Sequence, residues 1–221
     1  MFVGHYGVSF AATRTNVPLP LWVWFVAVQW LDFGFMTLLL AGVEKARLVD
    51  GFTESNALDL YYMPYSHGLP GAIGMSLGLA VIVAVAFKAG RTPMAFAMVA
   101  LASFSHWILD LFMHTPDMPL YDNHAKVGFG LWDHPLASLT LEFATLVLGA
   151  WLYTRSPAVS RQGARLVWAF VALLVVVHLG STFGPSPSSP EAFAVTALVA
   201  YVLFAALAAW VERRAVVQHA A

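Results

Sequence analysis

The sequence predicts an all-α membrane protein, a polytopic bundle of about six membrane-spanning helices. Two observations support this fold class. The 221 residues are 60% hydrophobic and only 10% charged, whereas about a quarter of the residues in a soluble domain are charged. The apolar residues also gather in runs of roughly 20, the length that a helix needs to cross a bilayer. We expect a single integral membrane domain that covers residues 1–221.

Six apolar runs are assigned to spans in chain order. They cover residues 21–43, 69–87, 93–113, 135–153, 166–180 and 192–211. Residues 1–13 are apolar but too few to cross alone, so we expect a half-helix, an interfacial helix or a re-entrant segment there. Pro18 and Pro20 then interrupt the chain before the first full span. The segments 44–67 and 114–134 are long and polar, and we interpret them as loops on one side of the membrane.

The basic residues predict the orientation of the bundle, because cytoplasmic loops carry an excess of Lys and Arg. One side holds Arg14, Lys88, Arg91, Arg155, Arg161, Arg165, Arg213 and Arg214, and the other holds Lys45, Arg47 and Lys126. This asymmetry predicts that both termini lie in the cytoplasm and that the protein is integral to the cell (inner) membrane.

Composition also limits the ligands and partners. The formal net charge is −1, which argues against nucleic acid as a partner, and the lipid bilayer is the partner we expect. The sequence has no cysteine, which excludes disulfides and thiolate metal sites. A bound metal must therefore be held by His, Asp, Glu or backbone oxygens. The oligomeric state is left open.

His106, Asp110 and His114 form the most informative pattern in the chain. They follow one another at i, i+4 and i+8 at the end of the third apolar run. On an α-helix this spacing places all three on one face, with a drift of about 40° and a rise of about 6 Å per step. Ionisable groups within a membrane are costly and indicate function. Two imidazoles and a carboxylate on one stripe are suitable metal ligands, although a packing hydrogen bond between His106 and Asp110 is the alternative.

The order of the spans brings other polar residues toward the same region. His67 precedes the second span at a similar depth, and Asp32 lies near the middle of the first span. Asp32 has the alternative of pairing with Gln29 or with a neighbouring backbone group, and the role of His67 alone would be ambiguous. Asp117 either caps a helix after Pro116 or assists the site.

Three further polar residues within apolar segments stay open or are given a structural role. His5 follows Gly4 in the N-terminal apolar segment, and from the residues alone its role stays open. His178 is interpreted as a core histidine with satisfied hydrogen bonds. Glu142 is interpreted as an interhelical hydrogen-bonding group or as a partner of a metal ligand.

A divalent cation at this site would offset the cost of burying the two aspartates, and it would lower the pKa of a bound water to about 7. We expect zinc first, with magnesium or manganese as alternatives. Asp110, His114 and Asp117 are the expected catalytic residues, with His114 or Asp117 either orienting a ligand or acting as a general acid. The depth of the site suggests a lipid-linked ester or phosphoester as substrate.

At these residues the chain resembles the bacterial membrane-bound metal-dependent hydrolases of the LexA-binding inner-membrane type. Gly4-His5, Leu31-Asp32, Ser66-His67 and Ser105-His106 with Leu109-Asp110 match the family's motifs in order over roughly the first half of the chain. The resemblance implies metal-dependent hydrolysis and adds His5 to the ligands. It also implies that residues 1–13 fold back toward His106 as a re-entrant segment.

The chain departs from the family pattern in two places. The family's paired acids are reduced to Asp32, and its His-Arg before the Thr-His-Ser element is missing, so His114 and Asp117 would have to replace lost ligands. Over nearly its full length the chain more closely resembles a group of bacterial membrane proteins, sometimes labelled permeases, which carries no established activity. Residues 114–120 and 126–132 carry this second resemblance.

Two other classes of function are left open. A transporter or permease would use the same histidines and aspartates as an ion or proton site, and it should show a polar path from His106 toward Lys88 and Arg91. A non-catalytic membrane protein with a structural metal should have every ligand position filled. An enzyme should show an open metal position beside a cleft that lipid or water can reach.

Overall fold

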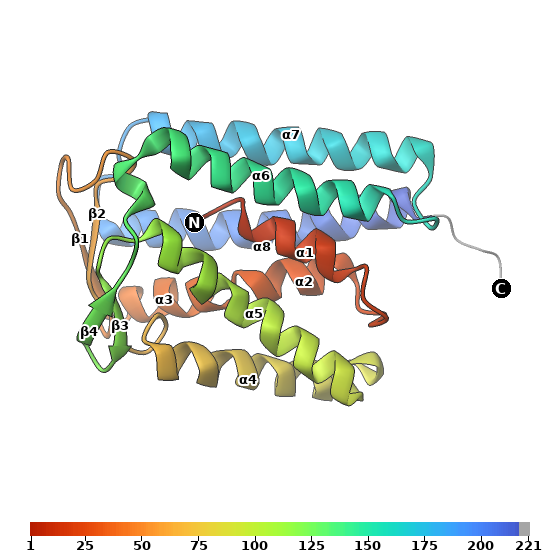
Figure 1. Ribbon diagram of the computed structural model, residues 1–221, viewed down its shortest axis with the longest axis horizontal. Helices are drawn as coiled ribbons and strands as arrows, with labels where there is room; N and C mark the ends of the chain where they lie inside the picture. The colour runs from red at the N-terminus through yellow and green to blue at the C-terminus, as the bar shows by residue number, and fades with distance from the viewer. Residues whose placement is uncertain (217–221) are drawn as a thin grey trace.

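The computed structural model describes residues 1–216 as helices that lie roughly side by side along one axis (Figure 1). Five helices are long and apolar enough to cross a membrane, or six segments if a bent pair counts as one span. The five are α4 (Leu69–Ala86), α5 (Pro93–Met113), α6 (Pro135–Thr154), α7 (Arg161–Phe183) and α8 (Pro190–Ala215). The prediction of an all-α membrane bundle is confirmed. Residues 217–221 of the expected domain lie outside the described part.

The first expected span, residues 21–43, is not one straight helix. α2 (Leu21–Val28) and α3 (Trp30–Leu40) are bent by 53° relative to each other. The bend occurs at Gln29, whose φ of −101° and ψ of 7° depart from helical geometry. At this break the Val28 carbonyl accepts a hydrogen bond from His106 Nδ1 at 2.6 Å. Broken helices are tolerated at membrane depth where such partners satisfy the backbone.

Local sequence explains where the long helices begin. Proline occupies the first turn of α4, α5, α6 and α8, where its missing N–H costs no hydrogen bond. Thr92, Ser160 and Ser189 precede α5, α7 and α8, and each side chain accepts a backbone N–H from the first turn. Because capping extends a helix beyond its apolar core, α7 is longer than the expected span 166–180.

The two expected polar loops each contain a small antiparallel hairpin. β1 (Lys45–Leu48) pairs with β2 (Leu58–Tyr62), and β3 (Met118–Tyr121) pairs with β4 (His124–Val127). Both hairpins lie at the same end of the bundle, together with the short helix η2 (Leu131–Asp133) (Figure 1). We call this the hairpin end. The opposite end, which includes η1 (Lys88–Arg91), is called the arginine end.

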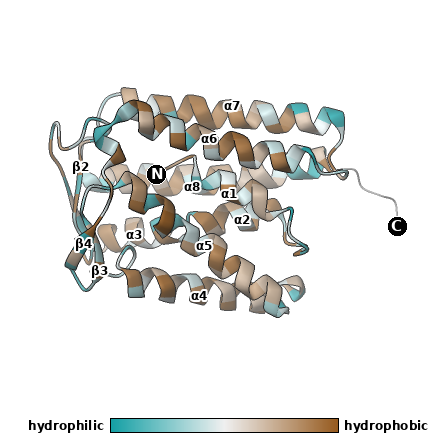
Figure 2. Ribbon diagram, viewed as in Figure 1, coloured by the Kyte–Doolittle hydropathy of each residue, from teal (hydrophilic) through white to brown (hydrophobic). Residues whose placement is uncertain are grey.

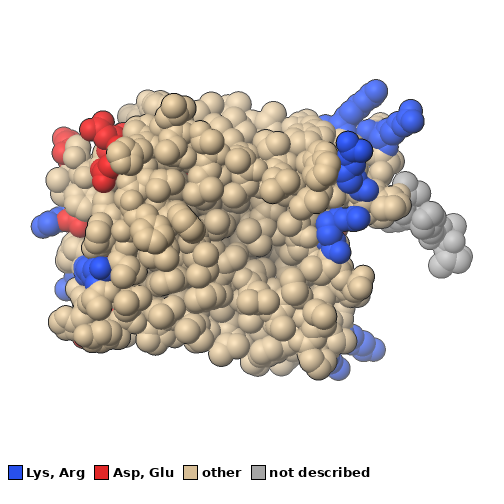
Figure 3. Space-filling model, viewed as in Figure 1, with Lys and Arg blue, Asp and Glu red and all other residues tan. Residues whose placement is uncertain are grey.

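Charge and hydropathy follow the axis of the bundle. The middle of the visible surface carries no Lys, Arg, Asp or Glu (Figure 3). Most of the visible Lys and Arg lie at the arginine end, and the visible acidic groups lie at the hairpin end together with a smaller number of basic groups. The long helices are hydrophobic along most of their length, and the polar segments are concentrated at both ends (Figure 2). This banded surface is what a bilayer selects. It supports the assignment as an integral membrane protein.

The N-terminal segment forms a short helix inside the bundle. α1 (His5–Ala12) is largely buried and packs most extensively against α6. A Cβ atom on Gly7 would overlap the Thr145 carbonyl, and one on Gly149 would overlap the Gly7 carbonyl. Glycine at both positions therefore allows the two backbones to touch. Residues 1–13 were expected to form a half-helix, an interfacial helix or a re-entrant segment. The short, buried α1 corresponds to the half-helix.

The buried side chains form two hydrophobic clusters along the axis. On α5, Val99 and Ala102 belong to the cluster that extends toward the arginine end. Trp107 belongs to the second cluster, together with Phe35 and Met63. His106 therefore lies at the boundary between the two clusters, in surroundings that keep water away from its polar neighbours.

Candidate metal centre

The six residues that the sequence analysis proposed as metal ligands lie together around one carboxylate. They are His5 of α1, Asp32 of α3, His67 before α4, and His106, Asp110 and His114 of α5 and its C-terminal cap. The four imidazole side chains are at most 3% exposed. Residues up to 109 positions apart in sequence thus meet in one buried cluster, which we call the His/Asp cluster.

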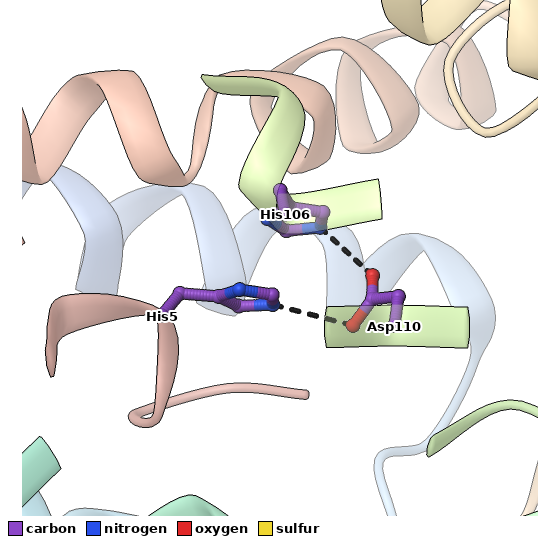
Figure 4. A group of neighbouring side chains, drawn as sticks. All are labelled: His5, His106 and Asp110. Carbon is purple, nitrogen blue, oxygen red and sulfur yellow. Dashed lines mark ion pairs between the residues drawn. The ribbon is translucent and has the colours of Figure 1, made fainter. Parts of the chain in front are cut away.

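Asp110 lies at the centre of the cluster, and its two oxygens face different partners. Oδ2 is 2.9 Å from His106 Nε2, 3.5 Å from His67 Nε2 and 3.7 Å from His114 Nε2. Oδ1 lies 3.2 Å from His5 Nε2 on the other side (Figure 4). The His5 ring stacks on the His106 ring with centroids 3.8 Å apart.

Asp32 brings a second carboxylate to the same histidines. Its Oδ1 is 3.4 Å from His106 Nε2 and 3.6 Å from His67 Nε2. Its Oδ2 accepts a hydrogen bond from the Tyr201 hydroxyl at 2.8 Å. The hydrogen-bond partner of Asp32 is therefore Tyr201 of α8, and not Gln29. Tyr201 turns Oδ1 toward the cluster.

The Val28 carbonyl determines the tautomer of His106. A carbonyl oxygen can only accept, so Nδ1 of His106 must carry the proton in their 2.6 Å hydrogen bond. In the neutral ring Nε2 then holds a lone pair. This lone pair points at the carboxylates of Asp110 and Asp32.

His67 is fixed in the same way by a chain of two hydrogen bonds. The Ser66 hydroxyl donates its single proton to Glu44 Oε2 at 2.6 Å. Its oxygen can therefore only accept from His67 Nδ1, 2.8 Å away. Trp107 Nε1 donates to the His67 carbonyl at 2.8 Å and holds its backbone. Nε2 of His67 thus also presents a lone pair to the carboxylates.

Asp117 orients His114 and does not serve as a helix cap. Its Oδ1 lies 2.8 Å from His114 Nδ1, and a carboxylate accepts the proton from that nitrogen. The Trp132 ring packs on the imidazole with centroids 4.2 Å apart. A carboxylate behind a histidine is the usual arrangement for holding a metal-ligating ring.

Glu142 of α6 holds the N-terminal segment in place. Its two carboxylate oxygens accept the backbone N–H groups of Phe2 and Gly4, each at 2.6 Å. The Met1 nitrogen contacts Asp110 Oδ1. These bonds and the α1–α6 contact together deliver His5 to the cluster. Neither interpretation of Glu142 is met as stated, because its partners are backbone N–H groups just before α1, in the segment that carries His5.

Several nitrogens of the cluster are buried without a hydrogen bond. Within residues 1–216, His5 Nδ1, His5 Nε2 and His106 Nε2 have no hydrogen-bond partner. Buried polar atoms are normally satisfied. Two sets of residues also have ligand atoms close enough to share a cation, namely His5, His106 and Asp110, and Asp32, His67 and His106. The donor set is therefore chemically suited to a divalent cation.

A cavity of about 480 Å³ adjoins the His/Asp cluster. Asp32, His67, Asp110 and His114 line it, whereas His5 and His106 lie behind them. His178 also lines the cavity and is 8% exposed, and its Nδ1 has no partner among the described residues. The interpretation of His178 as a satisfied core histidine is therefore wrong.

Three partners of the cluster were not predicted from the sequence: Glu44, Tyr201 and the Val28 carbonyl. Only Glu44 carried a signal, as an acid directly after the first apolar run. Comparisons of the chain with protein-family models, with curated proteins and with solved structures find no match. The resemblance to metal-dependent hydrolases therefore stays a prediction from motifs.

Proposed function

We propose that this protein is a membrane-embedded, metal-dependent hydrolase whose cation is held by Asp32, His67, His106 and Asp110. One observation carries the proposal. The acceptors at Nδ1 turn the Nε2 lone pairs of the histidines toward two buried carboxylates. Lone pairs and negative charges that face one another in a dry interior repel, and a divalent cation between them removes the repulsion.

The spacing of these ligand atoms is compatible with zinc. A tetrahedral zinc ion with bonds of about 2.0–2.1 Å keeps its ligand atoms about 3.3–3.4 Å apart. The four N···O distances between the two imidazoles and the two carboxylates lie between 2.9 and 3.6 Å. Two imidazole ligands also favour zinc over magnesium or manganese. His5 Nε2 lies 3.2 Å from the remaining oxygen of Asp110, to which the Met1 nitrogen donates a hydrogen bond.

When bound, the cation supplies a Lewis acid that polarises a carbonyl or phosphoryl oxygen and lowers the pKa of water to about 7. His114 faces the cavity and is held by Asp117. His114 takes a proton from the attacking water and returns it to the leaving oxygen. The water oxygen bonds to the carbonyl carbon or phosphorus, and the bond from that atom to the leaving oxygen breaks. Asp117 stabilises the protonated imidazole.

Two features favour this proposal over the alternative functions. A transporter needs a polar path from His106 toward the arginine end, but α5 in that direction contributes Ala95, Val99 and Ala102 to a hydrophobic cluster. A purely structural metal needs no access, but here four residues of the cluster line a cavity. The four proposed protein ligands would occupy a tetrahedral shell, so water or substrate from this cavity would have to bind as a fifth ligand, a coordination number that zinc can reach during catalysis.

We also infer that the membrane is the inner membrane of a bacterium, with the arginine end in the cytoplasm. The connections α4–α5 and α6–α7 lie at the arginine end together with the C-terminal end of α8 (Figure 1). They carry seven of the eight basic residues predicted on one side. The positive-inside rule then places the His/Asp cluster nearer the outer face.

Metal analysis of the purified protein tests the proposal. The wild type should contain zinc, and His106→Ala and Asp110→Ala should lose it. His124→Ala should retain it, because the His124 side chain is 69% exposed and lies outside the cluster. His114→Ala should keep the zinc but lose ester or phosphoester hydrolysis by about 10²–10⁴-fold, the usual contribution of a general acid–base group.

Melting curves would show whether the variants remain folded. Equal metal content in all folded variants would overturn the proposed site. Zinc that depends on His106 and Asp110, without turnover of any ester or phosphoester by the wild type, would favour the structural-metal alternative.

A further inference from the structure

The cavity beside the His/Asp cluster has the size and position of a ligand site. Its volume of about 480 Å³ falls within the ~300–1,000 Å³ that is usual for small-molecule pockets. It is bounded by α3, α6, α7 and α8 and by the β1–β2 hairpin, and residues of the cluster also line it. The proposed reacting groups are therefore reached from this cavity.

Much of the cavity lining is apolar. It includes Phe35 and Met36 of α3, beside the cluster, and Val177 of α7 with Ala197 and Ala200 of α8. These residues lie on helices that are assigned to the membrane. Small side chains on α8 leave room between α7 and α8. Walls of this kind favour a hydrocarbon chain over a small water-soluble ester.

The cavity opens where α7 ends and α8 begins. The exposed residues of its lining are grouped there: Ser181, Gly184, Pro185, Ser186 and Thr196. Ser181 lies in the last turns of α7, and Thr196 lies in the second turn of α8. Gly184, Pro185 and Ser186 lie in the connection between the two apolar helices, so the opening lies at the hairpin end of the α7–α8 pair, where we expect the lipid headgroups.

His178 supplies a polar group one turn deeper than Ser181. It is buried between the rings of Phe2 and Phe143, at centroid distances of 5.8 and 5.7 Å, and its Nδ1 has no hydrogen-bond partner within residues 1–216. Ser138 and Glu142 also line the cavity. A buried, unpartnered nitrogen that lines a cavity is suited to a carbonyl or hydroxyl of a bound molecule.

We propose that the cavity binds a membrane lipid of the leaflet at the hairpin end, which enters between α7 and α8. Its acyl chain lies along Val177, Ala197 and Ala200, and its ester or phosphoester group lies at His67, Asp110 and His114. His178 binds the polar region next to the chain. The identification of this lipid as substrate rests on the proposed hydrolase function, whereas the binding of its chain does not.

Photolabelling tests this inference without relying on activity. The probe is phosphatidylethanolamine with a diazirine in one acyl chain, in vesicles of phosphatidylethanolamine and phosphatidylglycerol that contain the full-length protein. We expect labelled peptides from the cavity walls, including Val177, Ala197 and Ala200. Ala200→Trp should abolish this labelling by filling the cavity. Val199→Trp is the matched control, since Val199 is 53% exposed on the outside of α8.

Ser181→Trp is a second variant that blocks the opening at an exposed position, so it tests the inference even if Ala200→Trp does not fold. Zinc content should be unchanged in both variants. Labelling confined to exposed helix faces and equal in all variants would overturn the inference and leave the proposed function standing. Cavity labelling that Ala200→Trp or Ser181→Trp removes, in a protein without zinc, would support lipid binding and overturn the proposed hydrolase.

Discussion

The chemistry of the cluster depends on hydrogen bonds at the rear of each imidazole. Val28, Ser66 and Asp117 each engage an Nδ1 atom, and each leaves an Nε2 atom facing Asp110. Such outer partners fix the tautomer and the ring orientation of a ligand. The metal affinity should therefore respond to residues that do not contact the metal.

Ser66→Ala tests this dependence. The substitution removes the acceptor of His67 Nδ1 and the link to Glu44. Because the His67 ring would no longer be held in one tautomer, we expect the zinc affinity to fall by about 10–100-fold, the usual effect of losing such a partner. Competition with a chromogenic chelator in detergent solution measures this affinity.

Ser103→Ala is the matched control for that experiment. Ser103 is also a buried serine near the middle of the bundle, but its hydroxyl bonds to Ser76 and not to a proposed ligand. Its zinc affinity should equal that of the wild type. If both variants bind zinc like the wild type, Ser66 does not orient a metal ligand.

The candidate metal ligands could be predicted from the sequence, but the groups that hydrogen-bond to them could not. Helical spacing alone places His106, Asp110 and His114 on one face, and all three point into the cluster. Tyr201 reaches Asp32 from 169 positions away, and no local pattern in the sequence reports such a contact. His5 could be proposed only through a resemblance, because its position depends on how α1 packs.

Among the elements, the short helices α1, α2 and α3 contribute features that the long helix α5 does not supply. The break between α2 and α3 provides the Val28 carbonyl. The contact between α1 and α6 positions His5. Both features place backbone close to the cluster, where a continuous span would offer only side chains.

Gly149→Ala tests the role of the α1–α6 contact. Its new methyl group would overlap the Gly7 carbonyl, so α1 has to move away from α6 and take His5 with it. Overpacking of this kind costs about 1–3 kcal/mol. We expect a lower unfolding temperature in detergent and a weaker zinc affinity.

Gly78→Ala provides the comparison for Gly149→Ala. Gly78 is also within a membrane helix, but a Cβ atom there would meet nothing within 4 Å. Since Ala favours a helix over Gly by about 1 kcal/mol, this variant should be as stable as the wild type or more stable. An unfolding temperature that is unchanged in Gly149→Ala would show that α1 does not depend on this contact.

The long helices were predictable because the bilayer imposes their length and composition. The expected span 93–113 coincides with α5, since Pro93 begins it and its last residue precedes His114. The bend at Gln29 and the two hairpins were missed. A bend depends on tertiary partners, and strands of four or five residues are too short for their periodicity to stand out.

At the scale of the whole molecule, the two ends of the bundle differ in charge and in structure. One end is rich in Lys and Arg, and the other carries both hairpins and the opening of the cavity (Figures 1 and 3). The composition could predict this asymmetry, because the basic residues cluster in alternate connections. The cavity could not be predicted, since it is created by the way α3, α6, α7 and α8 pack.

The orientation of the bundle decides which leaflet supplies the proposed lipid, and cysteine labelling can measure it. The sequence has no cysteine, so each introduced cysteine reports a single site.

Glu54→Cys lies in the β1–β2 connection at the hairpin end, and Gln162→Cys lies in the first turn of α7 at the arginine end. Both positions are exposed. In intact bacterial cells, a membrane-impermeant maleimide should label Glu54→Cys and spare Gln162→Cys, because the orientation proposed from the positive-inside rule places the arginine end in the cytoplasm. After the membrane is permeabilised, both should be labelled, which controls for accessibility. The reverse pattern in intact cells would place the His/Asp cluster near the cytoplasmic face, and the lipid would then have to come from the inner leaflet.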